Sequence, residues 1–477
     1  MTTFGNLLAF SPELWLLLGA IVIVALGRVS SAQTTTRLAL VTLVLAFAAL
    51  ATQFKQTITI LDGAFVLDGF AIVVDVIILA TVALAVLASR ADILPGDSDL
   101  AMVPAFYLLV ALGAMLAASA TQMISLFVSL ELLAVNLYIL TGLLRRGRGS
   151  VGIALGYAVI GAATSGLLLY ALALLFGLTG ELQLGAAGTA LKAVRPGQPA
   201  VLLMLSLLIG GFALRLGLLP VRWWLRGFES GVSLRVVLLV QSVGVVAAFA
   251  VFGRVLAMTF AGTQIAYAPV LAGLAAILMT AGTFLSITQT SLRRLLSYSA
   301  IAQAGFALAA FTDLKGAGLS ALLVFMVALA LTTVGAFAAV IAYSRSVHSD
   351  AIRDLAGLVA PTPGVALALG LALLSIAGAP PLAGFLGKLL ILQATVDGGY
   401  AWLAVIGVVN IVIATLGYAR LIRTLFVDPP VFEVVPVRLD LGIRAAVAIA
   451  SASIVFMVAL MEPLYRAAGY GRSSILH

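Results

Sequence analysis

The chain has 477 residues, of which 63% are hydrophobic and only 9% are charged. Its mean hydropathy is +1.23, and a soluble fold of this length has no means of burying so much apolar surface, so we expect a polytopic membrane protein. Its 26 basic residues exceed its 18 acidic residues, but they are scattered singly through short loops, which argues against a nucleic-acid partner. Cysteine is absent, which excludes disulfides and thiolate ligation by this chain.

Runs of about 20 apolar residues, the length that crosses a bilayer, predict fourteen transmembrane helices. In chain order, the predicted ranges are 8–27, 37–54, 67–89, 101–119, 122–144, 151–177, 200–220, 235–257, 268–290, 296–312, 317–344, 363–395, 401–423 and 442–462. The range 363–395 is long because it contains Pro380-Pro381. The segments between these ranges are too short for a separate soluble domain.

The basic residues near the helix ends indicate an orientation. With the N-terminus outside, seventeen of them fall on the cytoplasmic side and seven, including Arg254, on the outer side. The remaining two, Arg215 and Lys388, lie inside predicted helices. Cytoplasmic loops of membrane proteins carry an excess of Lys and Arg, so this distribution predicts that both termini lie outside.

Two apolar segments are interrupted by proline and carry one cation each. Residues 210–224 contain Arg215 and Pro220, and residues 375–388 end on Lys388. A charge at this depth costs roughly 2.5–3.5 kcal/mol on insertion scales, and a proline-broken helix needs protein or water to satisfy its freed carbonyl groups. Paired broken helices in two halves of a chain indicate a transport pathway. The alternative is two kinked helices whose cations snorkel toward the interface.

Acidic residues are rarer still inside the predicted helices. Glu131 lies in the middle of one, and Asp75 lies inside the third. Glu13 and Glu462 are near helix ends, within reach of lipid headgroups, so a structural, anchoring role is expected for both. Because Glu131 and Arg215 are the only charges expected near their depth in the N-terminal half, we predict that they contact each other.

Three segments of the chain resemble a known family. These are Ser125-Leu-Phe-Val-Ser-Leu-Glu-Leu-Leu-Ala-Val-Asn-Leu-Tyr138, the stretch 292–306, and Ala377-Gly-Ala-Pro-Pro-Leu-Ala-Gly-Phe-Leu-Gly-Lys388. They are similar to subunit N of proton-pumping NADH–quinone oxidoreductase, respiratory complex I, an antiporter-like membrane subunit. The resemblance covers about residues 8–462, and the Leu-Glu-Leu-Leu form favours subunit N over its two paralogues.

The resemblance implies an all-α membrane fold with about fourteen transmembrane helices and two inverted five-helix repeats, helices 4–8 and 9–13, each with a proline-broken helix. It implies a location in a bacterial-type inner membrane. It divides the chain into an N-terminal three-helix segment (1–100), a first repeat (101–258), a second, inverted repeat (268–423), and a C-terminal helix with a tail (442–477).

Carried over residue by residue, the resemblance is strongest at two positions. Glu131 matches the buried glutamate of the family, and Lys388 matches the lysine of the second broken helix. Arg215 stands where the family has the lysine of the first broken helix. The chain departs from the family at further positions, namely Gly156 and Gln241 where helices six and eight carry a lysine, Gln303 where a histidine is usual, and Arg222 and Arg226-Gly227 after Pro220.

These departures concern proton transfer, because lysine can hold and release a proton whereas arginine stays protonated in proteins. We therefore expect a subunit of a complex I-like assembly whose N-terminal half-channel is altered or partly disabled. For Glu131 and Arg215, a purely structural ion pair is the alternative. Any remaining translocation is expected to depend on Lys388, with Gln303 and Tyr298 ordering water, although such groups also simply bond neighbouring helices.

No Walker or dinucleotide-binding motif occurs, and this chain is expected to bind no cofactor or metal. NADH, FMN, iron–sulfur clusters and quinone are expected on partner subunits, so the chain alone performs no redox catalysis. The expected partners are the antiporter-like and small membrane subunits of complex I, together with the lipid bilayer. Two alternatives remain open: a cation/proton antiporter subunit of an Mrp-type or membrane-hydrogenase assembly, and a scaffold that does not conduct.

Overall fold

The structure is a computed structural model, and it describes residues 10–27, 29–54, 56–89, 98–144, 150–194, 198–216, 232–347, 349–430 and 439–476. The first predicted break at Pro220 lies outside the described residues, as does the segment after it with Arg222, Arg226 and Gly227. The proline break of the first half therefore stays a prediction.

The described chain is mostly helical. The first half contains α2 (Ser11–Leu26), α3 (Ala32–Thr52), β1 (Ile58–Ile60), β2 (Phe65–Leu67), α4 (Gly69–Ser89), α5 (Ser98–Ala101), α6 (Val103–Ser119), α7 (Met123–Leu143), α8 (Ser150–Thr179), α9 (Leu184–Leu191), α10 (Pro199–Arg215), α13 (Leu234–Leu239), the π-helical segment η2 (Val240–Gly244) and α14 (Val245–Thr259).

The second half contains η3 (Ala261–Thr263), α15 (Gln264–Ile287), α16 (Leu292–Ala309), η4 (Ala310–Asp313), α17 (Gly318–Val347), η5 (Ile352–Leu355), α18 (Pro363–Ala377), α19 (Ala383–Asp397), α20 (Ala401–Phe426), α21 (Leu441–Phe456) and α22 (Met461–Leu476). Every predicted range contains a helix. The range 363–395 is divided between α18 and α19, and the range 235–257 passes through η2.

The helices have the lengths and surfaces of membrane spans. Within the described residues, nine helices are long and apolar enough to cross a bilayer, or ten if the bent pair α21–α22 forms one span. The apolar helices α2, α6, α10 and α18 are shorter. Large apolar side chains such as Val44, Val405 and Leu416 are exposed, which suits a surface that faces lipid. The chain is a polytopic membrane protein.

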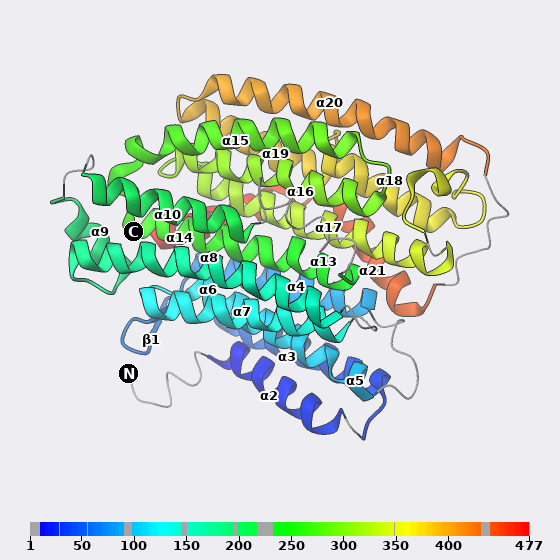
Figure 1. The fold of residues 1–477 in the computed structure, drawn as a ribbon, viewed down its shortest axis with the longest axis horizontal. Helices are drawn as coiled ribbons and strands as arrows, with labels where there is room; N and C mark the ends of the chain where they lie inside the picture. The colour runs from blue at the N-terminus through cyan, green and yellow to red at the C-terminus, as the bar shows by residue number, and fades with distance from the viewer. Residues whose placement is uncertain are drawn as a thin grey trace.

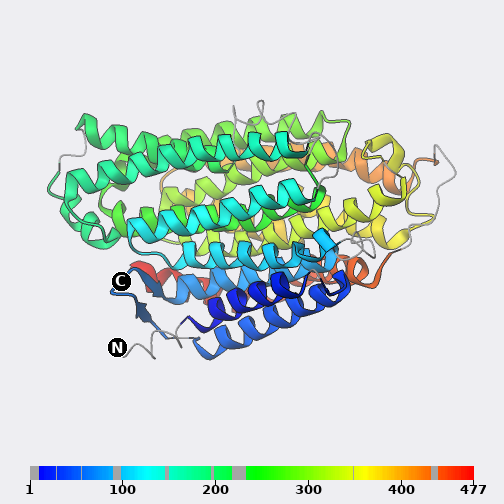
Figure 2. The ribbon, with the colours of Figure 1, turned by 60° about the horizontal axis from the view of Figure 1, so that its bottom comes forward.

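Most helices run side by side along one direction, with α2 and α3 at one edge of the bundle and α20 at the opposite edge (Figure 1). In the rotated view of Figure 2, the C-terminal helix α22 lies beside the N-terminal helices, in agreement with its packing on α4. The helix α2 begins at the end of the bundle where α22 ends. Two helices lie deep in the interior, since 94% of the α16 span and 89% of the α17 span are buried, against 33% of the α20 span.

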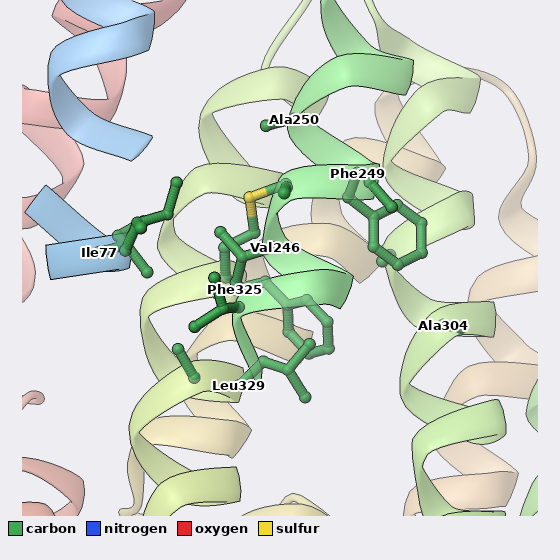
Figure 3. Packing of buried hydrophobic residues seen from close by; sticks show 14 of the residues in the cluster. Ile77, Val246, Phe249, Ala250, Ala304, Phe325 and Leu329 are labelled. Carbon is green, nitrogen blue, oxygen red and sulfur yellow. The ribbon is translucent and has the colours of Figure 1, made fainter. Parts of the chain in front are cut away.

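The interior joins the two halves through apolar packing. Figure 3 shows Ile77 of α4 together with Phe325 and Leu329 of α17 around Val246 of α14, with Phe249 of α14 beside them. Each of these side chains is buried. Because close packing rather than lipid exclusion holds membrane helices together, this contact gives the two halves a common core.

The C-terminal tail differs from the expectation. The helix α21 ends at Phe456, the chain then turns by 89°, and α22 packs against α4 and α17. The Phe70 amide donates to Ser474 Oγ at 3.0 Å, and Arg472 Nη1 donates to the Gly316 carbonyl at 2.7 Å. The tail is thus an ordered helix, stabilised by polar contacts that hydropathy does not encode.

The short hairpin of β1 and β2 was also not predicted from the sequence. Its antiparallel strands connect α3 to α4. Thr121 Oγ1 donates to the Gly63 carbonyl and Ser125 Oγ donates to the Ala64 carbonyl, both at 2.7 Å. The hairpin is therefore attached to the start of α7, the helix that carries Glu131.

Candidate functional site

The middle of α7 places Glu131 between α8 and the end of α10. Ser165 of α8 donates a hydrogen bond to Glu131 Oε1, and Arg215 Nη1 lies 3.6 Å from the same oxygen. Arg215 Nη2 also donates to the carbonyl of Leu130. The predicted contact between Glu131 and Arg215 is confirmed. The side chains are 30% and 12% exposed, respectively, so this chain encloses the pair only in part.

Arg215 is the last residue of α10, and it sits at the wall of a cavity of about 120 Å³ in the described part of the bundle. The polar side chains that line this cavity are Tyr138, Tyr157, Thr164, Arg215, Gln241 and Ser297, and the rest of the lining is apolar. A space of this size holds several water molecules, which need polar partners of this kind.

The cavity reaches from the first half of the chain to α16. Gln241, in the π-helical segment between α13 and α14, donates to Ser297 Oγ of α16 at 3.1 Å. Short π-helical segments occur often at functional sites. In the sequence, the segment that begins at Gln241 was noted only for its lack of charge, and its bond to α16 was not predicted. An amide side chain inside an apolar run is the feature that could have indicated this polar link between the halves.

The second broken helix is described in full. The helix α18 ends at Ala377, Gly378 adopts the left-handed conformation (φ +93°), the Pro380–Pro381 peptide bond is cis, and α19 begins at Ala383. The Ser375 hydroxyl accepts a hydrogen bond from the Gly384 amide at 3.0 Å. The break therefore leaves carbonyl groups at the end of α18 that face protein rather than lipid.

Lys388 satisfies these carbonyl groups. Its side chain is 1% exposed, and its Nζ donates to the carbonyls of Ile376 at 2.5 Å and Ala377 at 3.1 Å. The ammonium also lies over the Phe306 ring, 4.6 Å from the centroid. The cation is held by the negative end of a helix and an aromatic face, two interactions that stabilise positive charge without a carboxylate.

Gln303 belongs to the same group, because its Nε2 donates to the Ile376 carbonyl at 2.9 Å. Gln303 and Lys388 thus donate to the same carbonyl oxygen. The two side chains are adjacent, so no chain of water molecules is needed to connect them. Tyr298 is also buried and lies on α16 with Gln303. The two residues are five positions apart, which separates their side chains by about 140° around the helix axis. The structure brings Gln303 to Lys388 and places Tyr298 on another face of α16.

The sequence interpretation missed a second buried ion pair. Arg254 Nη1 and Nη2 donate to the two carboxylate oxygens of Asp68 at 2.9 and 2.8 Å, and the side chains are 1% and 4% exposed. The sequence placed Arg254 near the outer end of its helix but did not indicate that its side chain is buried, on α14, which continues to Thr259. Glu131 and Arg215 are therefore not the only buried charges of the N-terminal half.

The two glutamates expected near headgroups differ from each other. Glu462 is exposed and pairs with Arg466 at 2.7 Å, one turn along α22. Glu13 is 5% exposed, so the expectation that it lies within reach of headgroups was wrong. Its helix α2 packs closely on α3 and α6. Among the described residues, no group of three or more His, Cys, Asp and Glu is placed to hold a metal ion.

Comparison with known proteins assigns the chain to a family. Residues 120–414 match the family model for the membrane part of NADH:quinone oxidoreductases and Mrp antiporters. The chain is 30% identical to NADH-quinone oxidoreductase subunit N of Methylobacterium nodulans over 97% of both chains. It is 34% identical to NAD(P)H-quinone oxidoreductase subunit 2 of Synechococcus elongatus, over 85% of this chain and 78% of the relative.

Solved structures show the same fold. A chain of respiratory complex I from Thermus thermophilus superimposes with a TM-score of 0.81 at 27% identity, over 96% of this chain and 99% of that one. A chain of the Mrp complex from Dietzia superimposes with a TM-score of 0.85 at 20% identity, over 100% and 98%. At 20% identity, the second likeness shows the fold alone. The chain belongs to the family of antiporter-like membrane subunits of NADH:quinone oxidoreductases and Mrp antiporters, and within it to the subunit N group.

Proposed function

We propose that the chain is a membrane subunit of a complex I-like NADH–quinone oxidoreductase and takes part in proton translocation coupled to electron transfer to quinone. The observation that carries this proposal is the similarity to subunit N of Methylobacterium nodulans over 97% of both chains. The chain itself performs no redox chemistry. NADH, FMN, iron–sulfur clusters and quinone bind to partner subunits, and the antiporter-like and small membrane subunits are its neighbours.

In this proposal the chain crosses a bacterial-type inner membrane fourteen times, has both termini on the outer side, and contains two inverted five-helix repeats. A helix in each of the fourteen predicted ranges supports the number of crossings. The position of the start of α2 and the end of α22 at one end of the bundle supports termini on the same side.

The N-terminal half-channel is altered in its chemistry. Arg215 occupies the place of a lysine, pairs with Glu131 and binds the Leu130 carbonyl. Because a guanidinium stays protonated, this side chain holds a charge but passes on no proton of its own. Gln241 bonds Ser297 where a lysine would carry a proton further. A cavity lined by tyrosines and these polar groups still provides room for water.

The C-terminal half retains a group that can exchange a proton. The buried amine of Lys388 lies at the helix break, and Gln303 connects the same carbonyl group to α16. Translocation through this subunit therefore depends on Lys388. The role proposed for Tyr298 is weaker, because it lies on another face of the helix.

The identity of the parent complex is tested by purifying the native assembly and identifying its subunits. Peripheral flavin and iron–sulfur subunits that oxidise NADH support the proposal. Copurification with only antiporter subunits indicates an Mrp-type assembly, and with a hydrogenase module a membrane hydrogenase; either result contradicts the proposal. The fold does not discriminate between these assemblies, because it is similar both to the Mrp chain and to a chain of an archaeal sulfane sulfur reductase. The latter has a TM-score of 0.88 at 20% identity.

The role of Lys388 is tested by proton-to-electron stoichiometry in reconstituted vesicles. Lys388→Arg keeps a donor for the carbonyls of Ile376 and Ala377 but removes the ability to release a proton, so we expect assembly with reduced stoichiometry. Lys388→Met should reduce it as well, whereas Arg215→Met should affect mainly stability. Normal pumping by both Lys388 variants would show that the subunit is a scaffold.

A further inference from the structure

A second group of buried ionisable side chains lies at the end of the bundle where α2 and α4 begin. Asp68 accepts a hydrogen bond from the Ala71 amide at 2.8 Å and the two bonds from Arg254. Arg254 also lies over the Phe70 ring, 5.2 Å from the centroid. The positive charge of Arg254 is therefore matched by the carboxylate of Asp68, in a geometry that satisfies both oxygens of the acid.

Asp75 has no such partner. It is seven residues beyond Asp68, so it lies about 10 Å deeper along α4 and on nearly the same face of that helix. Its side chain is 0% exposed, and within the described structure neither carboxylate oxygen has a hydrogen-bond partner. An ionised carboxylate without hydrogen bonds or a counter-ion is among the most unfavourable groups to bury, so the neutral form is the one that this environment accommodates.

Glu13 is the second carboxyl of the group. It lies in the first turn of α2, and its Oε2 is also buried without a hydrogen-bond partner in the described residues. Glu13, Arg254 and Asp68 are the charged groups that act on Asp75 electrostatically. From α22, which packs across the start of α4, Tyr470 lies over Gly69, and Arg472 is directed to the Gly316 carbonyl instead.

The charges of this group do not balance when every acid is ionised. Asp68 neutralises Arg254, which leaves two further carboxyls and, in the described part of the chain, no second cation acting on Asp75. The described residues also provide no cluster of three acidic or histidine ligands for a metal ion, and the neighbouring guanidinium repels metal cations. A proton is the ligand that fits, since it needs only one or two carboxyl oxygens.

We propose that Asp75 is a proton-binding site in the N-terminal helices and that it holds a proton in the assembled protein. The Asp68–Arg254 pair beside it is a buried charge pair with two short hydrogen bonds. The site lies outside the residues to which the proposed function assigns proton transfer, namely Glu131, Arg215, Lys388, Gln303 and Tyr298.

The test compares two acids on one helix. Asp75→Asn replaces a protonated carboxyl by a neutral side chain of the same shape, so the complex should assemble with unchanged thermal stability. Asp68→Asn removes the partner of buried Arg254, so assembly or thermal stability should fall markedly. Failure of Asp75→Asn to assemble would overturn the proposal, because it would show that the negative charge of Asp75 is required.

Infrared spectroscopy of the purified complex detects protonated carboxyl groups, so it distinguishes a protonated Asp75 from a residue with a purely structural role. The carbonyl stretch of a protonated carboxyl shifts on transfer from H2O to D2O, and we expect the Asp75→Asn complex to lose one such band. Glu13→Gln should shift the frequency of that band, and Glu462→Gln, at an exposed acid, should leave it unchanged. If the bands of Asp75→Asn and the native complex are identical, Asp75 is ionised and the proposal fails. None of these outcomes depends on pumping.

Discussion

At the scale of residues, the two ion pairs of the N-terminal half differ in distance and enclosure. The side chain of Glu131 is 30% exposed and meets Arg215 through one oxygen at 3.6 Å, whereas Asp68 and Arg254 form two short bonds and are almost fully enclosed. Because Coulomb attraction falls with distance, the electrostatic contribution of the longer pair is smaller. Breaking the second leaves a charge in an apolar interior.

This difference predicts the outcome of two double-mutant cycles. For Glu131→Gln and Arg215→Met, we expect each single change to destabilise the complex and the double change to cost less than their sum, with a coupling energy of about 0.5–3 kcal/mol. Asp68→Asn with Arg254→Met should give a larger coupling, because a broken buried pair costs about 3–5 kcal/mol. Thermal stability of the purified complex is the measurement. Simple additivity at Glu131 and Arg215 would mean that their contact has no energetic value.

At the scale of elements, the break between α18 and α19 is built from more than its prolines. The Thr332 hydroxyl lies 2.9 Å from Ser375 Oγ, which in turn accepts from the Gly384 amide. Lys388 and Gln303 satisfy the Ile376 carbonyl. Irregular backbone at membrane depth is stable only when protein groups or water replace the missing helical bonds, and here side chains from α16, α17 and α19 do so.

The close approach of the two half-helices makes Gly384 a sensitive position. A Cβ added there would lie 1.8 Å from the Ser375 carbonyl oxygen, a backbone atom that has no free rotation. We expect Gly384→Ala to displace the start of α19 and to destabilise the complex by roughly 2 kcal/mol or more, together with a loss of proton translocation.

Gly364→Ala is the matched control, because Gly364 lies in α18 and a Cβ there would contact nothing within 4 Å. This variant should keep native thermal stability and native proton-to-electron stoichiometry. Equal behaviour of the two alanine variants would contradict the close contact between the half-helices.

At the scale of the whole molecule, the order of the helices determines which loops share a side of the membrane. The helix α2 runs away from one end of the bundle and α3 returns to it. The hairpin of β1 and β2 therefore lies at the end where α2 begins (Figure 1). The helix α22 lies at that end as well, which is the outer side in the proposed orientation.

Single-cysteine labelling tests this orientation without background, because the native chain contains no cysteine. Gln56 precedes the hairpin and Arg466 lies on α22, and both are exposed. An impermeant thiol reagent added from the periplasmic side should label Gln56→Cys and Arg466→Cys. It should not label Val29→Cys, an exposed position between α2 and α3 that serves as the control. Periplasmic labelling of Val29→Cys, or cytoplasmic labelling of the other two, would reverse the topology.

Hydropathy along the chain was enough to locate the helices, since each predicted range contains one. The physical reason is that a helix in lipid satisfies its own backbone hydrogen bonds, so its position follows from a local run of apolar residues. The contact between Glu131 and Arg215 was also predictable, because a charge inside such a run requires a partner. The association of Lys388 with a broken helix followed from Pro380-Pro381 in the same way.

Which groups meet across long separations in the chain depends on how the helices pack. Asp68 and Arg254 are 186 residues apart, and the position of Arg254 near the end of its predicted helix, 235–257, gave no sign that it faces Asp68. The burial of Glu13 and Asp75, the bond from Gln241 to Ser297, and the shared carbonyl of Gln303 and Lys388 depend likewise on which helices are neighbours. Hydropathy measures how each segment partitions into lipid, and it contains no information on which faces of two helices pack together.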